Sequence, residues 1–208
     1  MSIAHGEQIG TLEEHEGAPE RGINWWGMIF FIASEALIFA NLIAAYLYLE
    51  IRNGSWTVPA EMTLPIINTF VLLGSSIPAR IAGDSIAKGN QRNFKLALFI
   101  TMLMGAYFLG GQIYEYSGLF GKHFTPQTSV PGEAAVSGSA FFTLTGFHGL
   151  HVTIGLIFLL IVWLRGLRGD FTAKKHWAAQ AGEMYWHFVD GVWVVVFSTV
   201  YLLPLIRG

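Results

Sequence analysis

The sequence contains no cysteine and few charged residues. The absence of cysteine among its 208 residues excludes disulfides, CxxC redox pairs, iron–sulfur ligation and a cysteine-bound copper centre. Only 12% of the residues are charged and 53% are apolar, whereas soluble domains usually carry about 25% charged residues. The composition therefore excludes an ordinary water-soluble globule. Any chemistry must use histidines, carboxylates or a partner.

Long basic runs are also absent. The 12 lysines and arginines are outnumbered by 14 aspartates and glutamates, so no nucleic-acid partner is expected. Residues 1–23 form an acidic polar segment that resembles neither a basic-then-apolar signal peptide nor an arginine-rich transit peptide. Targeting is therefore expected to come from the first apolar helix.

Long apolar stretches follow this segment. Each is long enough to cross about 30 Å of hydrocarbon at about 1.5 Å per residue. The second stretch contains Arg80 and Asp84, whose four-residue spacing puts them on one helix face, where they can pair. The sequence predicts an all-α polytopic membrane protein in which residues 24–208 form a bundle of five transmembrane helices. The predicted spans are residues 24–50, 65–87, 94–118, 136–164 and 181–206.

The distribution of lysine and arginine predicts how the bundle is oriented. The side that carries the N-terminus and the second and fourth connections holds more basic residues than the other side, which holds Arg52, Lys122 and Arg207. Under the positive-inside rule, the N-terminus lies inside the cell and the C-terminus outside. The richer side contains Arg21, Lys88, Arg92, Lys95, Arg165, Arg168, Lys174 and Lys175.

Small residues predict close packing between the helices. Ala36, Ala40 and Ala44 recur every four residues in the first span, and Gly146 and Gly149 lie in the fourth. Such residues let helix backbones approach in lipid, where no hydrophobic force drives helix association. A tight bundle is expected.

Ionisable residues inside the spans are the candidate functional residues, because each is costly in hydrocarbon unless it is paired. Glu35 lies 11 residues past Asn24, which is about 16 Å along a helix and hence near mid-bilayer. It is predicted either to hydrogen-bond across helices or to exchange protons. The other candidates are His148 and His151 in the fourth span and Glu183, His187 and Asp190 in the fifth.

Helical spacing puts His148 and His151 on one face, and does the same for Glu183, His187 and Asp190. These ligand types could hold zinc, a di-iron pair or a haem. The depth of the residues counts against one compact site, since His151 lies about 21 Å from the inner end of its helix and Glu183 only about 5 Å. Interhelical hydrogen bonding is therefore the favoured interpretation.

Arg165 ends the fourth span, and Arg168, Lys174 and Lys175 follow it. One interpretation is that these charges only set the topology. The other is that Arg165 contacts the phosphate of an anionic lipid, because a planar guanidinium suits a phosphate bidentately.

Each predicted span also contains one segment with a distinctive pattern. The segments are residues 27–35 (GMIFFIASE), 68–73 (NTFVLL), 111–116 (GQIYEY), 145–152 (TGFHGLHV) and 185–193 (YWHFVDGVW). Together and in this order they resemble subunit III of the haem–copper terminal oxidases, from about residue 24 to the C-terminus. The resemblance implies a helical bundle that carries no haem or copper and lies against the catalytic subunit I of a cytochrome c or quinol oxidase.

The resemblance also implies roles for single residues. Glu35 matches the family's carbodiimide-reactive intramembrane glutamate, and Arg165 matches an arginine that holds a phospholipid head group in relatives. Many members have seven helices, so the chain looks like the shorter bacterial form, in which another chain would close part of the lipid cleft. No catalytic residue and no metal ligand are expected in this chain. The expected proton-exchange or buried polar network comprises Glu35, His148, His151, His187 and Asp190.

The leading functional hypothesis is a non-redox accessory subunit of a proton-pumping oxygen reductase in a bacterial plasma membrane. It would stabilise subunit I, bind phospholipid and assist proton uptake in aerobic respiration. Its partners would be subunit I directly, subunit II, further oxidase subunits and membrane lipids, with haem and copper in the partner subunits. Two alternatives are a homologous accessory subunit of a nitric oxide reductase and a free-standing proton carrier that uses Glu35.

Overall fold

The computed structural model describes residues 22–53, 61–127 and 136–207. Residues 1–21 of the predicted acidic segment lie outside this part of the chain, and Ile23 already begins the first helix. The described residues form long helices and no strand. The elements are α1 (Ile23–Asn53), α2 (Thr63–Ala87), α3 (Gln91–Gly121), α4 (Ser137–Arg168), α5 (Trp177–Phe197), the π-helix η1 (Ser198–Leu202) and α6 (Leu203–Arg207).

Five helices of the described chain are long and apolar enough to cross a membrane. The prediction of an all-α bundle with five spans is therefore confirmed. Most helices extend a few residues past the predicted bounds, because polar residues at their ends still form helical hydrogen bonds. In α3, for example, the side chain of Asn90 caps the first turn by accepting a hydrogen bond from the backbone of Asn93 at 3.1 Å. At the C-terminal end of α4, Gly169 adopts a left-handed conformation with φ of 81° and terminates the helix.

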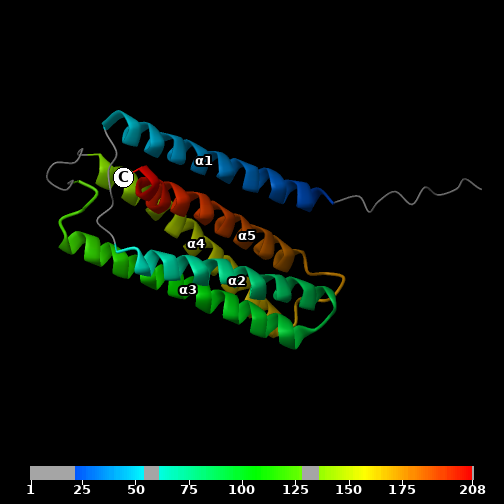
Figure 1. Ribbon diagram of the computed structural model, residues 1–208. Coiled ribbons are helices and arrows are strands. Elements are labelled where there is room, and N and C mark those ends of the chain that lie inside the picture. Colours follow the sequence, from blue (N-terminus) through cyan, green and yellow to red (C-terminus); the bar gives the residue numbers. More distant parts are fainter. Residues whose placement is uncertain (1–21, 54–60, 128–135, 208) are drawn as a thin grey trace, which may run out of the picture.

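Helix α5 lies at the centre of the arrangement and packs against α1, α2 and α4, while α3 packs against α2 and α4. Figure 1 shows α1 on the opposite side of the bundle from α2 and α3. The start of α1, the α2–α3 turn and the α4–α5 connection lie at one end, and the C-terminus lies at the other (Figure 1). The members of the richer basic set that the structure describes, from Lys88 to Lys175, therefore gather at one end of the bundle. That this end faces the inside of the cell stays a prediction.

Trp186 of α5 is the largest fully buried side chain in the core. Its indole nitrogen donates a hydrogen bond to the hydroxyl of Ser75 on α2 at 2.8 Å. Glycines on α3 and α4 make room for the ring. A Cβ atom at Gly105 would lie 2.5 Å from the ring atom Cη2, and one at Gly155 would lie 3.2 Å from the same side chain. The indole thus fixes the separation of four helices.

The small-residue prediction is confirmed for one position and wrong for another. A Cβ atom at Gly149 would lie 2.8 Å from Gln112 Oε1, so α3 and α4 do approach closely there. The alanine stripe of α1 does not pack against a helix of this chain, because Ala36, Ala40 and Ala44 are exposed and line a groove. Phe39 of α1 and Phe188 of α5 also line this groove, with their ring centroids 6.5 Å apart.

The close approach at Gly105 generates a stability prediction. We expect Gly105→Ala to lower the free energy of unfolding by about 1–3 kcal/mol, because the added methyl overpacks the Trp186 ring. The matched control is Gly110→Ala on the same helix, where a Cβ atom meets nothing within 4 Å. Thermal unfolding of the purified protein in detergent measures both variants. Equal melting temperatures for the two variants would contradict the packing described here.

Candidate functional site

Glu35 of α1 is hydrogen-bonded across the bundle to His151 of α4. Glu35 Oε2 lies 2.9 Å from His151 Nε2, and His151 Nδ1 lies 2.8 Å from the carbonyl oxygen of Phe147. The Phe39 ring packs edge-on against the imidazole at a centroid distance of 4.7 Å. The sequence predicted both residues as members of one polar network. The structure brings them into direct contact.

The geometry of this pair limits where its protons lie. A carbonyl oxygen can only accept, so His151 Nδ1 must carry a hydrogen and donate it to Phe147. The bond between Nε2 and Glu35 then needs one further proton, which is held either by the carboxyl or by the imidazole. The Glu35–His151 pair therefore shares one proton between two titratable groups. That proton can move between the carboxyl and the imidazole with little movement of heavy atoms.

A second polar cluster joins α2 to α5. The hydroxyl of Ser76 lies 3.0 Å from His187 Nδ1 and makes a short hydrogen bond to Asp190 Oδ2. Arg80 Nη1 lies 3.2 Å from Glu183 Oε1, which in turn lies 3.7 Å from His187 Nε2. The three candidates of α5 thus gather along one face, as their spacing predicted. The sequence did not single out their partners on α2 as functional residues, and it predicted for Arg80 only the pairing with Asp84.

The predicted partner of Arg80 is also present. Its Nε lies 3.7 Å from Asp84 Oδ1, one turn along α2. The guanidinium therefore bridges two carboxylates, Asp84 on its own helix and Glu183 on α5. The predicted pairing of Arg80 with Asp84 is confirmed.

His148 does not join the His151 pair, although the two share α4. Its side chain is fully buried and packs against the rings of Trp193 at 4.7 Å, Phe108 at 5.7 Å and Phe39 at 6.4 Å. Neither of its ring nitrogens has a hydrogen-bond partner in the described part of the chain. Three residues along a helix turn the side chain by about 60°, which is enough to send His151 toward α1 and His148 toward α3 and α5.

A third polar cluster was not predicted. Glu115 of α3 accepts a hydrogen bond from the Tyr201 hydroxyl at 2.7 Å. Nearby, the Gln112 side-chain amide donates to the Thr145 carbonyl at 2.8 Å and to the Tyr116 hydroxyl at 3.0 Å. Glu115 carried the same signal as Glu35, an ionisable residue inside a span, and that signal could have found it. Tyr201 lies in the π-turn η1, whose position the sequence does not reveal.

Arg165 lies at the end of α4 and is about half exposed. Its Nε donates to Asp170 Oδ2 at 3.1 Å, and its guanidinium carbon lies 5.1 Å from the centre of the Phe171 ring. These contacts hold the planar guanidinium in place. They engage only one of its three nitrogens by a hydrogen bond within the described residues.

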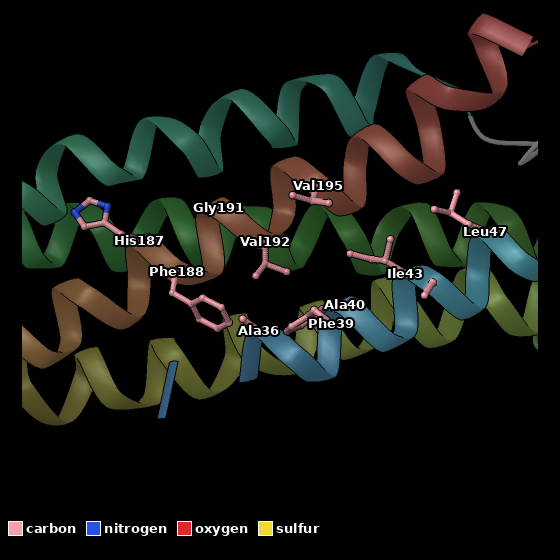
Figure 2. Close-up of a pocket in the computed structure, with 11 residues that line it drawn as sticks. Ala36, Phe39, Ala40, Ile43, Leu47, His187, Phe188, Gly191, Val192 and Val195 are labelled. Atoms are coloured by element: carbon pink, nitrogen blue, oxygen red, sulfur yellow. The ribbon is translucent and has the colours of Figure 1, made fainter. Parts of the chain in front are cut away.

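An apolar groove of about 650 Å³ separates α1 from α5. Figure 2 shows His187 at one end of the groove, with Val195 and Leu47 toward the other end. Between these ends the groove is lined by apolar side chains, with one wall formed by α1 and the other by α5. The groove residues are Ala36, Phe39, Ala40, Ile43, Ala44, Leu47, His187, Phe188, Gly191, Val192 and Val195.

The polar side chains thus form separate clusters along the bundle. Within residues 22–53, 61–127 and 136–207, no three histidine or carboxylate side chains converge in the manner of metal ligands. Each cluster instead joins neighbouring helices through hydrogen bonds, and the cluster of Gln112 and Glu115 joins α3 to both α4 and η1. The chemistry that this arrangement supports is hydrogen bonding and proton exchange inside a membrane.

Comparisons with known proteins identify close likenesses over almost the whole chain. Residues 6–204 match the family model of cytochrome c oxidase subunit III. Cytochrome c oxidase subunit 3 of Thermostichus vulcanus is 38% identical over 204 residues, which cover 96% of each chain. The protein of the same name from Synechocystis sp. is 35% identical over 93% of this chain and 81% of its own. That from Loxodonta africana is 36% identical over 92% of this chain and 74% of its own.

Proposed function

This chain belongs to the cytochrome c oxidase subunit III family, and from that membership we propose that it acts as the accessory, non-redox subunit of a proton-pumping haem–copper oxygen reductase. It is a multi-pass membrane protein and a subunit of a haem–copper oxidase, in complex with other oxidase subunits. In the finer proposal it lies against subunit I in a bacterial plasma membrane. There it stabilises subunit I, holds phospholipid and assists proton uptake.

One observation carries the proposal. The family match runs through all five spanning helices, from residue 6 to residue 204. The described bundle is therefore the unit that the family shares, and its histidines and carboxylates are engaged with each other and with serine, backbone or aromatic partners. This supports a structural and proton-handling role, with haem and copper held by partner subunits.

Purification of the complex in mild detergent tests this assignment. We expect the chain to co-purify with haem-bearing subunits, and we expect the chain separated from them to contain no stoichiometric iron or copper. The intact complex should consume oxygen. Purification as a free-standing protein would support the proton carrier instead, and consumption of nitric oxide without oxygen consumption would support the nitric oxide reductase assignment.

The shared proton of Glu35 and His151 supports a role in proton exchange. We expect Glu35→Gln to leave the complex assembled and to slow turnover by no more than about threefold, which is under about 0.7 kcal/mol of activation free energy. The amide keeps a hydrogen bond to His151 but cannot exchange the proton. Oxygen consumption and the ratio of haem to protein measure the two effects.

The control for this variant is Ser34→Ala. Ser34 is adjacent and exposed, and its hydroxyl donates to the Phe31 carbonyl of its own helix at 2.7 Å. The control should retain wild-type turnover. Loss of the haem-bearing subunits from the Glu35→Gln complex would refute the proton-exchange role, because it would make the pair a requirement for assembly.

The exposed guanidinium of Arg165 supports a lipid site. Asp170 and Phe171 orient the group, and its remaining donors suit the two oxygens of a phosphate. We expect Arg165→Ala to deplete tightly bound anionic phospholipid and to shorten the lifetime of activity during turnover. Mass spectrometry of lipids retained by the complex measures the first effect, and oxygen consumption over successive turnovers measures the second.

The matched control for the lipid site is Arg168→Ala. Arg168 lies in the same last turn of α4, is exposed and carries the same charge. Removal of Arg168 should leave the retained lipid close to the wild-type amount. Equal lipid content in the wild type and in both variants would argue against a specific site at Arg165.

A further inference from the structure

The cluster between α2 and α5 forms an ordered series of polar groups that leads from the bundle end into its interior. Arg80 is mostly exposed and contacts Glu183, and Glu183 lies beside His187 Nε2. His187 Nδ1 contacts the Ser76 hydroxyl, which also contacts Asp190. Asp190 is only 3% exposed. Exposure is therefore greatest at Arg80 and least at Asp190, although the His187 side chain, whose edge faces the groove of Figure 2, is 37% exposed and Glu183 only 13%.

Depth along the helices supports the same order. Glu183 lies 6 residues past the first residue of α5, Trp177, and Asp190 lies 13 residues past it. At about 1.5 Å per residue these positions are about 9 Å and about 20 Å from the start of the helix. Asp190 is therefore a carboxyl in the middle of the spanning segment. Only a short polar series connects it to the end of the bundle.

Ser76 permits two arrangements of the protons in this series. In the first, the Asp190 carboxyl is neutral and donates to Ser76 Oγ, while the Ser76 hydroxyl donates to a bare Nδ1 of His187. In the second, Asp190 is ionised and accepts from Ser76, while His187 Nδ1 carries a hydrogen and donates to Ser76 Oγ. The two states differ by a shift of one proton from Asp190 to Ser76 and one from Ser76 to His187.

We propose that Asp190 is a proton-binding site in the membrane interior, loaded through Ser76 and His187 from the bundle end where α2 ends and α5 begins. A proton from water reaches His187 Nε2 beside the Glu183 carboxylate, and the imidazolium passes its Nδ1 proton to Ser76. Ser76 passes its own proton to the Asp190 carboxylate, and the imidazole is left neutral with its hydrogen on Nε2. One proton leaves the water and one is gained by Asp190.

The surroundings of Asp190 allow it to hold a proton, and we refer to it as a proton store. Its other oxygen, Oδ1, has no hydrogen-bond partner in the described residues. One turn further on, the Trp193 indole is committed to Thr69 at 2.9 Å. A proton held by Asp190 therefore leaves by the route through which it came. The store is separate from the Glu35–His151 pair, whose hydrogen bond joins α1 to α4.

Other charged and titratable groups surround α5 on the helices packed against it. Arg80 is the group bonded into the series, through Glu183. The remaining groups are Asp84 on α2, His148 and His151 on α4, and Glu35 on α1. Asp84 pairs with Arg80, Glu35 pairs with His151, and His148 packs among aromatic rings.

Infrared difference spectroscopy of the intact purified complex tests the proposal. On a change of pH, the wild type should show the carbonyl stretch of a protonated carboxylic acid, and Asp190→Asn should lack that band. Asp190→Glu keeps the carboxyl and should shift the band. If the asparagine variant fails to assemble, this shift still assigns the band to residue 190. A wild-type spectrum without such a band, or a band unchanged in both variants, would overturn the proposal.

The route is tested by the rate at which this band responds to transfer into D2O. Ser76→Ala removes the only group that contacts both His187 and Asp190 within the described residues, so the response should slow by about tenfold or more. The matched control is Ser75→Ala, which removes a buried hydroxyl bonded to Trp186 and leaves the series intact. Equal rates in the wild type and Ser76→Ala would overturn the route through Ser76. A static hydrogen-bonded cluster would give that result.

Discussion

The need to satisfy every polar group inside hydrocarbon is the constraint on which this structure depends. An unpaired polar or ionised side chain costs several kcal/mol in such surroundings. The bundle meets the constraint at several positions by pairing side chains between helices, whereas the ring nitrogens of His148 and Oδ1 of Asp190 have no hydrogen-bond partner in the described residues. Glu35 contacts His151, the Trp186 indole contacts Ser75, and Ser76 contacts two groups of α5. The same contacts that hold the helices together also place protons at defined positions, so structure and proton handling have one physical origin.

The sequence was sufficient to predict the spans and the identities of most buried ionisable groups, because both follow from length, hydropathy and the cost of charge in lipid. It was not sufficient to predict the partners. A serine such as Ser76 is ordinary in a membrane helix, and its role depends on which face of α2 meets α5. Apolar residues cover most faces of these helices, so the pattern leaves their rotation open. The same uncertainty in helix rotation explains why the sequence did not predict that His148 and His151 point toward different helices.

Helix α1 shows what the constraint leaves undecided. It contacts α4 and α5, and the Glu35–His151 hydrogen bond links it to α4. Elsewhere α1 presents large apolar side chains such as Phe30 and Leu37 outward. Exposure of these side chains to lipid carries no free-energy cost, since hydrocarbon solvates them as well as another helix would. A subunit that pairs its polar groups internally can therefore offer an apolar face to lipid and to neighbouring subunits.

Three glycines of the bundle lie opposite polar side chains. A Cβ atom at Gly83 would collide with the Glu183 carboxylate, and one at Gly111 would collide with the Asn68 amide. One at Gly149 would lie 2.8 Å from Gln112. In each case a polar side chain crosses to a facing helix at the point where that helix has no side chain of its own. Polar pairing in lipid needs close backbones, and close backbones need glycine. At these three positions the glycine and the polar side chain are therefore parts of one pattern, whereas Gly105 and Gly155 make room for the Trp186 ring.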